Sequence, residues 1–472
     1  MADFLTALFV IFVVVVIFNI IIFVHELGHF LAARWRGLEV ERFQIWFGKP
    51  IWKKTYNGVQ YGLGWIPFGG FVALPQMVTM EKIEGENMTE QPLPPAKPWD
   101  KIIVAFAGPF FSFLLALVTA VAVYFVGKPD QRIDTTRIGY VKPDSPAMKA
   151  NFKVGDQILA INGMEVNCFA GNMDEGIVEN IAISEGEKIV FTVKREGLEE
   201  PIEITTGFEI PETPWWQRKA MRKVGIGYME RVIVGNIVPG GPAAEAGLKE
   251  DDVILSYNGI QATSSGPFFD IAKDGKPVEL VVLRDGEELL LTITPRKALP
   301  PYDKHPVFGM GFKFDGSLEK SEIIHPGPWD QIVDSASVMK KTLQLVASRL
   351  SSIGVDQLAG PVGIGKGYYQ MLTSSKDGWK LALAFTVLFN INLAILNMLP
   401  FPVLDGGHIT LSLLEIIAGR PVQAKILEVI QTVFVLLIFS LFLYITSKDI
   451  GSFIPGGNEK KGKMEFAPVE SG

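Results

Sequence analysis

Four apolar stretches dominate the hydropathy pattern of the chain: residues 4–24, 101–126, 381–398 and 429–445. Within the first stretch, only Thr6 and Asn19 interrupt the apolar run. A helix that rises 1.5 Å per residue needs about 20 such residues to cross a hydrocarbon core of roughly 30 Å. The first stretch is too long for a secretory signal peptide, and no positive charge precedes it. The pattern therefore predicts four membrane-spanning helices.

Positively charged residues predict the orientation of these helices. No Lys or Arg precedes the first stretch, and six lie between positions 34 and 54. By the positive-inside trend, the N-terminus then lies outside and the first helix ends at the cytoplasmic face. Arg420 and Lys425 mark the loop before the fourth helix as cytoplasmic. The lysines of the polar tail after Ile450 run against this trend.

The pattern over residues 40–74 predicts short strands. Asn57-Gly58 separates two of them and is a strong hairpin turn, because both residues tolerate positive φ. The following run, residues 61–72, is apolar, aromatic and rich in glycine. It would form either a surface sheet or a sheet that dips into the membrane, where protein or a watery cavity must satisfy its backbone. So many uncovered aromatic side chains favour the second arrangement, a membrane re-entrant β region.

Between the second and third apolar stretches the hydrophobic runs are short, which predicts a soluble insertion of roughly 250 residues. The insertion contains a repeat, because residues 141–163 align without gaps onto residues 237–259 and place Pro146 on Pro242. A Pro-Ala helix start, a Gly/Asp turn, a short strand and an Asn-Gly turn resemble PDZ domains of the bacterial protease type. Such domains bind an extended peptide as an added strand. The alternative is a pair of small β modules that only space or shield.

The expected fold is a polytopic α-helical membrane protein of four spans with a re-entrant β region and two extracytoplasmic PDZ-like α+β domains. An amphipathic helix is expected over residues 328–350, where apolar positions recur at helical spacing. The expected layout is 1–38 first transmembrane helix, 39–75 re-entrant β region, 76–100 cytoplasmic loop, 101–127 second transmembrane helix, 128–215 and 216–300 PDZ-like domains, 301–380 linker and amphipathic helix, 381–410 third transmembrane helix, 426–447 fourth transmembrane helix and 448–472 tail.

Composition agrees with a membrane protein and excludes other classes. Hydrophobic residues make up 48% of the 472 residues, and a mean hydropathy of +0.26 is high for a fully soluble chain. The net charge of -7 comes without a large basic block, so no nucleic-acid partner is expected. The single cysteine, Cys168, excludes an internal disulfide and a cysteine zinc ribbon. A zinc site would need His and carboxylate ligands.

Candidate chemistry lies at the inner end of the first apolar stretch, in His25-Glu26-Leu27-Gly28-His29. Residues four apart share one face of a helix, so both imidazoles can bind one Zn²⁺ while Glu26 reaches the water on the metal. Ionisable groups at membrane depth are costly unless they face a metal, water or a protein interior. The pentapeptide therefore predicts a metal site inside a bilayer.

A catalytic zinc site needs a third protein ligand. The third apolar stretch enters from outside and continues into Asn397-Met398-Leu399-Pro400-Phe401-Pro402-Val403-Leu404-Asp405-Gly406. Asp405 therefore arrives near the cytoplasmic end, level with His25 and His29. His-Glu-x-x-His in the first span, combined with Asn-x-x-Pro-x-Pro-x-Leu-Asp-Gly in the third, resembles the site-2 protease family of intramembrane zinc metalloproteases.

The resemblance covers most of the chain and implies roles for individual residues. His25, His29 and Asp405 would bind Zn²⁺, and Glu26 would act as the catalytic general base. The implied substrate-binding residues are Asn397, Pro400, Pro402, Gly64, Gly69 and Gly70. One departure lies in the second span, where relatives tend to have Ala-Gly-Pro-x-x-Asn and this chain has Ser112 as the last residue. Any role of an Asn at that position is therefore in doubt.

Three further histidines need separate interpretation. His408 follows Asp405 by three residues and either caps a helix start, supports the metal ligands or adds a ligand. His305 and His325 lie in and after the soluble insertion, and we expect them on the surface.

The implied activity is zinc-dependent hydrolysis of a peptide bond in or beside the transmembrane helix of a single-span protein already trimmed on its outer side. The implied substrates are an anti-sigma factor or a remnant signal peptide, cut after a first, site-1-type cleavage in regulated intramembrane proteolysis. The enzyme would lie in a bacterial inner membrane. Its periplasmic PDZ-like domains would act as a size filter, and its active site would lie near the cytoplasmic side.

Helical substrates must be unwound before cleavage, since helical hydrogen bonds shield their peptide bonds. We expect the run of residues 61–72 to offer a strand edge that pairs with the unwound segment. Two alternatives to this activity remain open: a non-catalytic membrane-anchored PDZ receptor for envelope proteins and a conventional metalloprotease. The receptor would need no buried ionisable groups, and the conventional enzyme would place its zinc outside the apolar layer.

Overall fold

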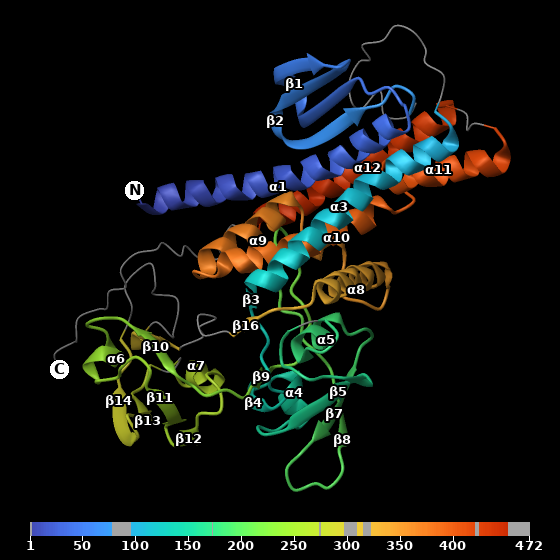
Figure 1. Cartoon of the computed structure of the whole chain (residues 1–472). Coiled ribbons are helices and arrows are strands. Elements are labelled where there is room, and N and C mark those ends of the chain that lie inside the picture. Colours follow the sequence, from blue (N-terminus) through green and yellow to red (C-terminus); the bar gives the residue numbers. More distant parts are fainter. Residues whose placement is uncertain are drawn as a thin grey trace. The chain divides into compact units, whose positions relative to one another are not determined.

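The computed structural model describes residues 2–77, 96–171, 173–272, 275–296, 309–314, 322–420 and 424–451. The chain divides into two compact units. Unit 1 comprises residues 1–130, 322–344 and 358–449, and unit 2 comprises residues 131–321, 345–357 and 450–472. Figure 1 labels the helices and strands of both units.

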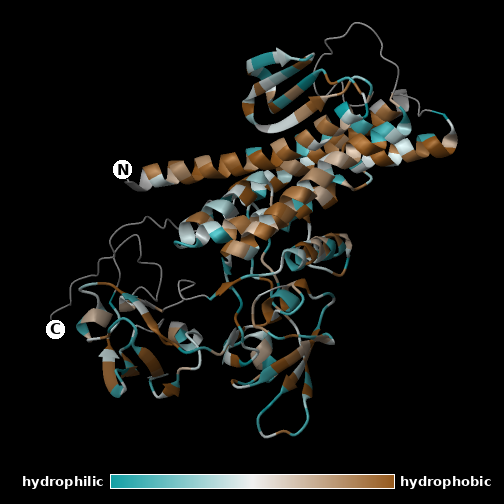
Figure 2. Cartoon of the chain, viewed as in Figure 1, coloured by the Kyte–Doolittle hydropathy of each residue, from teal (hydrophilic) through white to brown (hydrophobic). Residues whose placement is uncertain are grey.

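Four helices in the described part of the chain are long and apolar enough to cross a membrane. They are α1 (Ala2–Trp35), α3 (Pro98–Val126), α10 (Gly378–Asn397) and α12 (Ala424–Gly451). Figure 2 shows hydrophobic residues along most of their length. Phe9 of α1 and Leu436 of α12 are 64% and 61% exposed, which suits a surface that contacts lipid rather than water. Four helices at the predicted positions therefore have the length and composition of membrane spans.

The third span is shorter than predicted. α10 ends before Pro400 and Pro402, which lack the backbone N–H that a continuing helix needs. A separate helix, α11 (Asp405–Ala418), follows the turn. The turn is tight, because a Cβ on Gly406 would collide with carbonyl oxygens of the residues that follow α10. The predicted span over residues 381–410 is therefore two helices, and the expected zinc ligand begins the second one.

Unit 1 also contains smaller elements. The predicted amphipathic helix is α8 (Pro328–Ala347), which buries Ile332 and Met339. A helix that the sequence pattern did not predict, α9 (Pro361–Ser374), precedes the third span. Two short strands, β3 (Lys128–Pro129) and β16 (Ile323–Ile324), form an antiparallel pair.

The predicted hairpin consists of β1 (Arg42–Tyr56) and β2 (Val59–Ala73). Its turn residues Asn57 and Gly58 have φ of 49° and 81°, in the left-handed region that the sequence predicted. β1 and β2 each fold back, so that residues 42–45 pair with residues 60–63 on one side and with residues 70–73 on the other. The hairpin packs against α1. Its insertion into the bilayer stays a prediction.

This register corrects the expectation that the whole run of residues 61–72 offers a free edge. Residues 61–63 pair on their second side with residues 52–54 and are therefore internal. Residues 70–73 pair only with residues 42–45 among the described strands, so the edge lies there.

Unit 2 is built from two modules with the same topology. The first has a four-stranded antiparallel sheet in the order β6-β5-β7-β8, and the second has one in the order β12-β11-β13-β14. A two-stranded sheet accompanies each of them, β4-β9 in the first module and β10-β15 in the second. The matching strand orders support the internal repeat in the sequence. The assignment of the modules to PDZ domains stays a prediction.

The first module contains β4 (Ile138–Val141), β5 (Gln157–Ile161), β6 (Met164–Glu165), β7 (Ile189–Lys194), β8 (Ile202–Thr206), β9 (Ile226–Tyr228), α4 (Pro146–Lys149) and α5 (Ile177–Ile183). The second contains β10 (Val234–Ile237), β11 (Val253–Tyr257), β12 (Ile260–Gln261), β13 (Val278–Arg284), β14 (Glu287–Ile293), β15 (Phe312–Phe314), α6 (Pro242–Glu245) and α7 (Gly266–Ala272).

The hydrophobic cores place the module boundaries later than predicted. Val224 is buried in the first core, and Tyr228 packs against it, so the first module continues beyond residue 215. Met310 and Phe312 are buried in the second core, which therefore extends beyond residue 300. In each module, the last strand pairs with the strand at the start of that module. A boundary drawn from the start of each repeat misses this closing strand.

Each module also buries one ion pair at the same place in the repeat. Arg195 donates from Nε and Nη2 to Asp156, both at 2.7 Å, and Arg284 donates likewise to Asp252 at 2.7 and 2.6 Å. The two Asp side chains are almost completely buried and each also accepts a backbone N–H. Such fully bonded pairs are the form in which a protein interior tolerates charge.

Candidate metal centre

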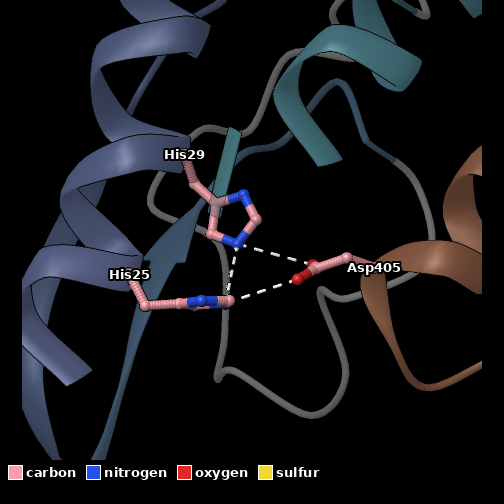
Figure 3. A group of neighbouring side chains, drawn as sticks. All are labelled: His25, His29 and Asp405. Carbon is pink, nitrogen blue, oxygen red and sulfur yellow. Dashed lines mark hydrogen bonds and ion pairs between the residues drawn. The ribbon is translucent and has the colours of Figure 1, made fainter. Parts of the chain in front are cut away.

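His25, His29 and Asp405 converge at one point of unit 1. His25 and His29 lie one turn apart on α1, and Asp405 begins α11 (Figure 3). His25 Nε2 lies 3.3 Å from Asp405 Oδ2, and His29 Nε2 lies 3.4 Å from Asp405 Oδ1. The two Nε2 atoms are 3.3 Å apart. The structure thus brings together the three residues that the sequence predicts as metal ligands.

The spacing of these atoms fits a zinc ion. Nitrogen and oxygen ligands bind Zn²⁺ at roughly 2.0 to 2.2 Å in a tetrahedral arrangement, which sets neighbouring ligand atoms about 3.3 Å apart. The three distances in this group match that value. Two imidazole nitrogens and one carboxylate are also a ligand set found in catalytic zinc sites, where the fourth position is left for water or substrate.

The remaining imidazole nitrogens have partners that orient the rings. His29 Nδ1 donates to the carbonyl oxygen of Val104 at 2.8 Å, which directs its Nε2 towards Asp405. His25 Nδ1 lies 3.0 Å from the hydroxyl of Ser112, a fully buried residue of α3. Sequence reasoning treated this position only as a departure, and its spacing from His25 gave no signal of the contact.

Two glycines allow α1 and α3 to approach closely at the centre. A Cβ on Gly28 would collide with the carbonyl oxygen of Ala107. A Cβ on Gly108 would lie 2.9 Å from His25 Nε2 and closer still to His29. Gly108 and Pro109 lie inside α3, which begins at Pro98 and continues to Val126.

A cavity of about 170 Å³ opens beside His25, His29 and Asp405. Glu26 lines it together with these three residues, and Asn397 lines it from the end of α10. Gly70, Phe71 and Val72, from the edge segment of β2, form another part of its wall. The predicted base, one predicted substrate-binding Asn and a free strand edge therefore border the same space.

Four other predicted substrate-binding residues do not line this cavity among the described residues: Gly64, Gly69, Pro400 and Pro402. A Cβ on Gly64 would collide with backbone carbonyl oxygens of β1. Gly69 has φ of 75° and lies against the ring of Phe47. The bend of the sheet requires glycine at these two positions. The two prolines belong to the turn between α10 and α11, where they end the helix.

The other histidines differ in their surroundings. His408 is buried in the first turn of α11 and lines the cavity, so the structure agrees with a place beside the metal ligands. His325 Nδ1 donates to the carbonyl oxygen of Tyr124 at 2.7 Å within unit 1. His305 lies outside the described residues.

Comparison with known proteins identifies the family. Residues 13–441 match the model of Peptidase family M50. This chain belongs to peptidase family M50. Its relatives include the "putative zinc metalloprotease" of Vibrio cholerae, 30% identical over 92% of this chain and 97% of the relative. The regulator of sigma-E protease RseP of Salmonella typhimurium is 27% identical over 91% of this chain and 96% of the relative. Protease RseP of Yersinia pestis is 28% identical, again over 91% of this chain and 96% of the relative.

The predicted resemblance to the site-2 proteases, and to RseP in particular, is confirmed by these matches. The chain is a zinc-dependent metalloprotease with four apolar helices long enough to cross a membrane. The alternative of a non-catalytic receptor is thereby excluded.

Proposed function

We propose that this M50 peptidase cleaves peptide bonds within the transmembrane segments of single-span membrane proteins. His25, His29 and Asp405 would hold the zinc ion, and Glu26 would be the general base. The observation that carries the proposal is the place of His25 and His29 inside the apolar helix α1, facing Asp405 and a cavity. A conventional metalloprotease would have no reason to set these groups in a membrane span.

When bound, zinc supplies a Lewis acid that polarises the scissile carbonyl and makes water a stronger acid. Glu26 lines the cavity next to the ligands and would take the proton of the attacking water and pass it to the leaving amine. The carboxamide of Asn397, which lines the same cavity, can bond the substrate backbone. Ser112 and the Val104 carbonyl would hold the two imidazoles in orientation.

The edge segment of β2 would hold the substrate in extended form. A helix drawn into the site must exchange its internal hydrogen bonds for others, because lipid offers none. Residues 70–73 have a strand side that pairs with no other described strand, and they line the cavity through Gly70, Phe71 and Val72. An unwound segment added to this edge would lie across the cavity. Exposed aromatic residues elsewhere on the hairpin, among them Trp52 and Trp65, support its insertion into the bilayer.

Substrate class and topology follow from the relatives and the charge pattern. Relatives named regulator of sigma-E protease support an anti-sigma factor as substrate, with a remnant signal peptide as the other candidate, each cut after a first cleavage. The positive-inside trend puts the zinc near the cytoplasmic side of a bacterial inner membrane and unit 2 in the periplasm. Groups on the far side of a membrane roughly 30 Å thick cannot take part in catalysis.

We therefore assign unit 2 a filtering role: it would obstruct partners with bulky outer domains and admit trimmed ones. Replacing residues 131–314 by a flexible linker should preserve hydrolysis of a trimmed substrate and permit cleavage of the untrimmed form. A deletion protein that cuts the trimmed substrate and still refuses the untrimmed one would place selection in the membrane part.

The central test is Glu26→Gln in purified protein with a single-span substrate. The substitution keeps the side-chain volume and removes the base, so cleavage should fall by at least ~10²-fold. Zinc content, measured by metal analysis, should stay unchanged, since the new carboxamide would leave the three ligands as they are. Cleavage at the wild-type rate would refute the assigned role of Glu26.

A further inference from the structure

A segment of unit 2 exposes two adjacent tryptophans. Residues 211–223 join the last strand of the first sheet to β9, and we call them the linker segment. Trp215 is 82% exposed and Trp216 is 40% exposed, with their rings packed edge to face at 5.8 Å. Met221, in the same segment, is 48% exposed. Neither module uses these side chains in its core, and large apolar groups gathered on a surface mark a place of contact.

The linker segment is also basic. It carries Arg218, Lys219, Arg222 and Lys223 against a single acidic residue, Glu212. Tryptophan beside Lys and Arg is the combination found where proteins meet the boundary between lipid headgroups and hydrocarbon. The indole accepts a half-apolar environment, and the cations attract anionic headgroups.

Arg222 joins the linker segment to neighbouring parts of unit 2. Its guanidinium lies 3.9 Å from the ring centroid of Phe208 and donates to the carbonyl oxygen of Gly186 at 2.8 Å. It also donates to the carbonyl oxygen of Leu350 and to the Ser352 hydroxyl at 3.2 and 3.0 Å. The side chain of Leu350 is itself 64% exposed. We call the exposed side chains of Trp215, Trp216, Met221 and Leu350 the linker patch.

From these observations we infer that the linker patch docks on the bilayer surface, with both indoles among the headgroups and Lys219 and Lys223 facing anionic phospholipid. The contact gives unit 2 an attachment to the membrane in addition to its covalent connections. A soluble protein partner would satisfy the indoles equally well. An anionic bilayer also matches the charge of Lys219 and Lys223, and the chain joins unit 2 to a unit with helices long and apolar enough to cross a membrane.

The test uses the full chain labelled with 5-fluorotryptophan, in nanodiscs that contain phosphatidylglycerol. Fluorine signals of Trp215 and Trp216 are assigned from Trp215→Phe and Trp216→Phe variants. A nitroxide on the lipid headgroup should broaden both signals at least twofold more than a water-soluble gadolinium chelate does. The matched control is Leu290→Trp, which places a tryptophan at a position of unit 2 that is 66% exposed and remote in sequence from the linker segment. Its signal should show the opposite preference.

Charge is tested separately with Lys219→Gln/Lys223→Gln protein in the same nanodiscs. The lipid-induced broadening should fall in this variant and in wild-type protein at high salt, because the attraction to headgroups is screened. Signals of Trp215 and Trp216 that respond to the gadolinium chelate as strongly as the control does would overturn the inference. It would also be overturned if these signals ignored the lipid nitroxide and shifted only when a single-span substrate is added, which would mark a protein-binding site.

Discussion

Asp405 of unit 1 and Asp252 of unit 2 are both withdrawn from water, and the difference between their partners is instructive. Asp252 receives two hydrogen bonds from Arg284, at 2.7 and 2.6 Å, and one from a backbone N–H at 2.8 Å. Asp405 faces the imidazole nitrogens of His25 and His29 at 3.3 and 3.4 Å. The first carboxylate is matched by a cation of the chain, whereas the second is arranged with two imidazole nitrogens around a point that suits a metal cation.

This difference separates a stabilising charge from a functional one. The ion pair of Asp252 recurs in the first module as Asp156 with Arg195, which is expected for a bond that each module needs in order to fold. A cavity borders both acids, since Asp252 and Arg284 line a pocket of the second module, so a cavity alone does not distinguish them. The distinction lies in the partners: Asp252 is bonded to a guanidinium, whereas Asp405 faces two imidazole nitrogens at distances that suit shared binding of a metal ion.

The largest effect should come from Asp405→Ala. With one of three protein ligands removed, zinc should be lost and cleavage of a single-span substrate should fall to background. The measurement is zinc content per protein alongside the cleavage rate. Circular dichroism should show the helices intact, since no Arg or Lys of the described residues pairs with Asp405 and would be stranded. Full zinc occupancy in this variant would remove Asp405 from the ligand set.

Asp252→Ala tests the stabilising ion pair of the second module. Removing one member of a buried pair strands Arg284, and the second module should lose about 3–5 kcal/mol of stability. Amide hydrogen exchange of β11 and β13 should therefore accelerate, with zinc content unchanged. Glu250→Ala, at an exposed neighbour, is the matched control and should leave exchange as in wild type. A loss of zinc from Asp252→Ala protein would contradict the separation of roles.

Val72→Pro examines the wall of the cavity rather than its ligands. Proline at the free edge cannot donate to an added strand, so cleavage of a helical substrate should fall several-fold more than cleavage of a short unstructured peptide. Leu63→Pro should behave differently, because Leu63 is paired with Ile45 and Trp52 and its loss would disrupt the sheet for both substrates. Equal losses for both substrates in Val72→Pro would show that the edge is only structural.

The smallest effect is expected from Ser112→Ala. The hydroxyl orients His25 from outside the ligand set, and loss of such a contact typically lowers metal affinity by roughly 10-fold or somewhat more. Zinc affinity measured by competition with a chelator is the direct readout. Ser112→Thr retains the hydroxyl and should retain most of the affinity. Unchanged affinity in Ser112→Ala would mean that the contact does not support the metal.

Local signals in the sequence predicted much of this structure. These signals are a hydrophobic run long enough to span a membrane, an Asn-Gly turn and two histidines four residues apart. Each of them predicts a local geometry from the residues of one short segment. The place of Asp405 was predicted from topology, because the third span has to end on the side where the first one does. These predictions needed only chain direction and helix geometry.

The remaining features depend on pairings between distant residues. Residues 42–45 lie between two segments of β2, and no nearby residue in the sequence indicates this. Pairing with either segment alone would also give their backbone groups hydrogen bonds, so the sequence does not show that both are present. β9 closes the first module although it follows the predicted boundary, since its partner β4 lies far upstream. The contact of Ser112 with His25 likewise requires the close packing of α1 and α3. In the sequence, only Gly108 indicates that another helix could approach α3 so closely.

The position of Asp405 at the start of α11 has a consequence for biosynthesis. The two histidines are made first and enter the membrane with the first span, but the third ligand is translated only after both modules of unit 2 and the third span. No partly synthesised chain has a complete ligand set. With this ligand set, a chain truncated before α11 would bind no catalytic zinc, and the protease would become active only after both modules of unit 2 have been synthesised.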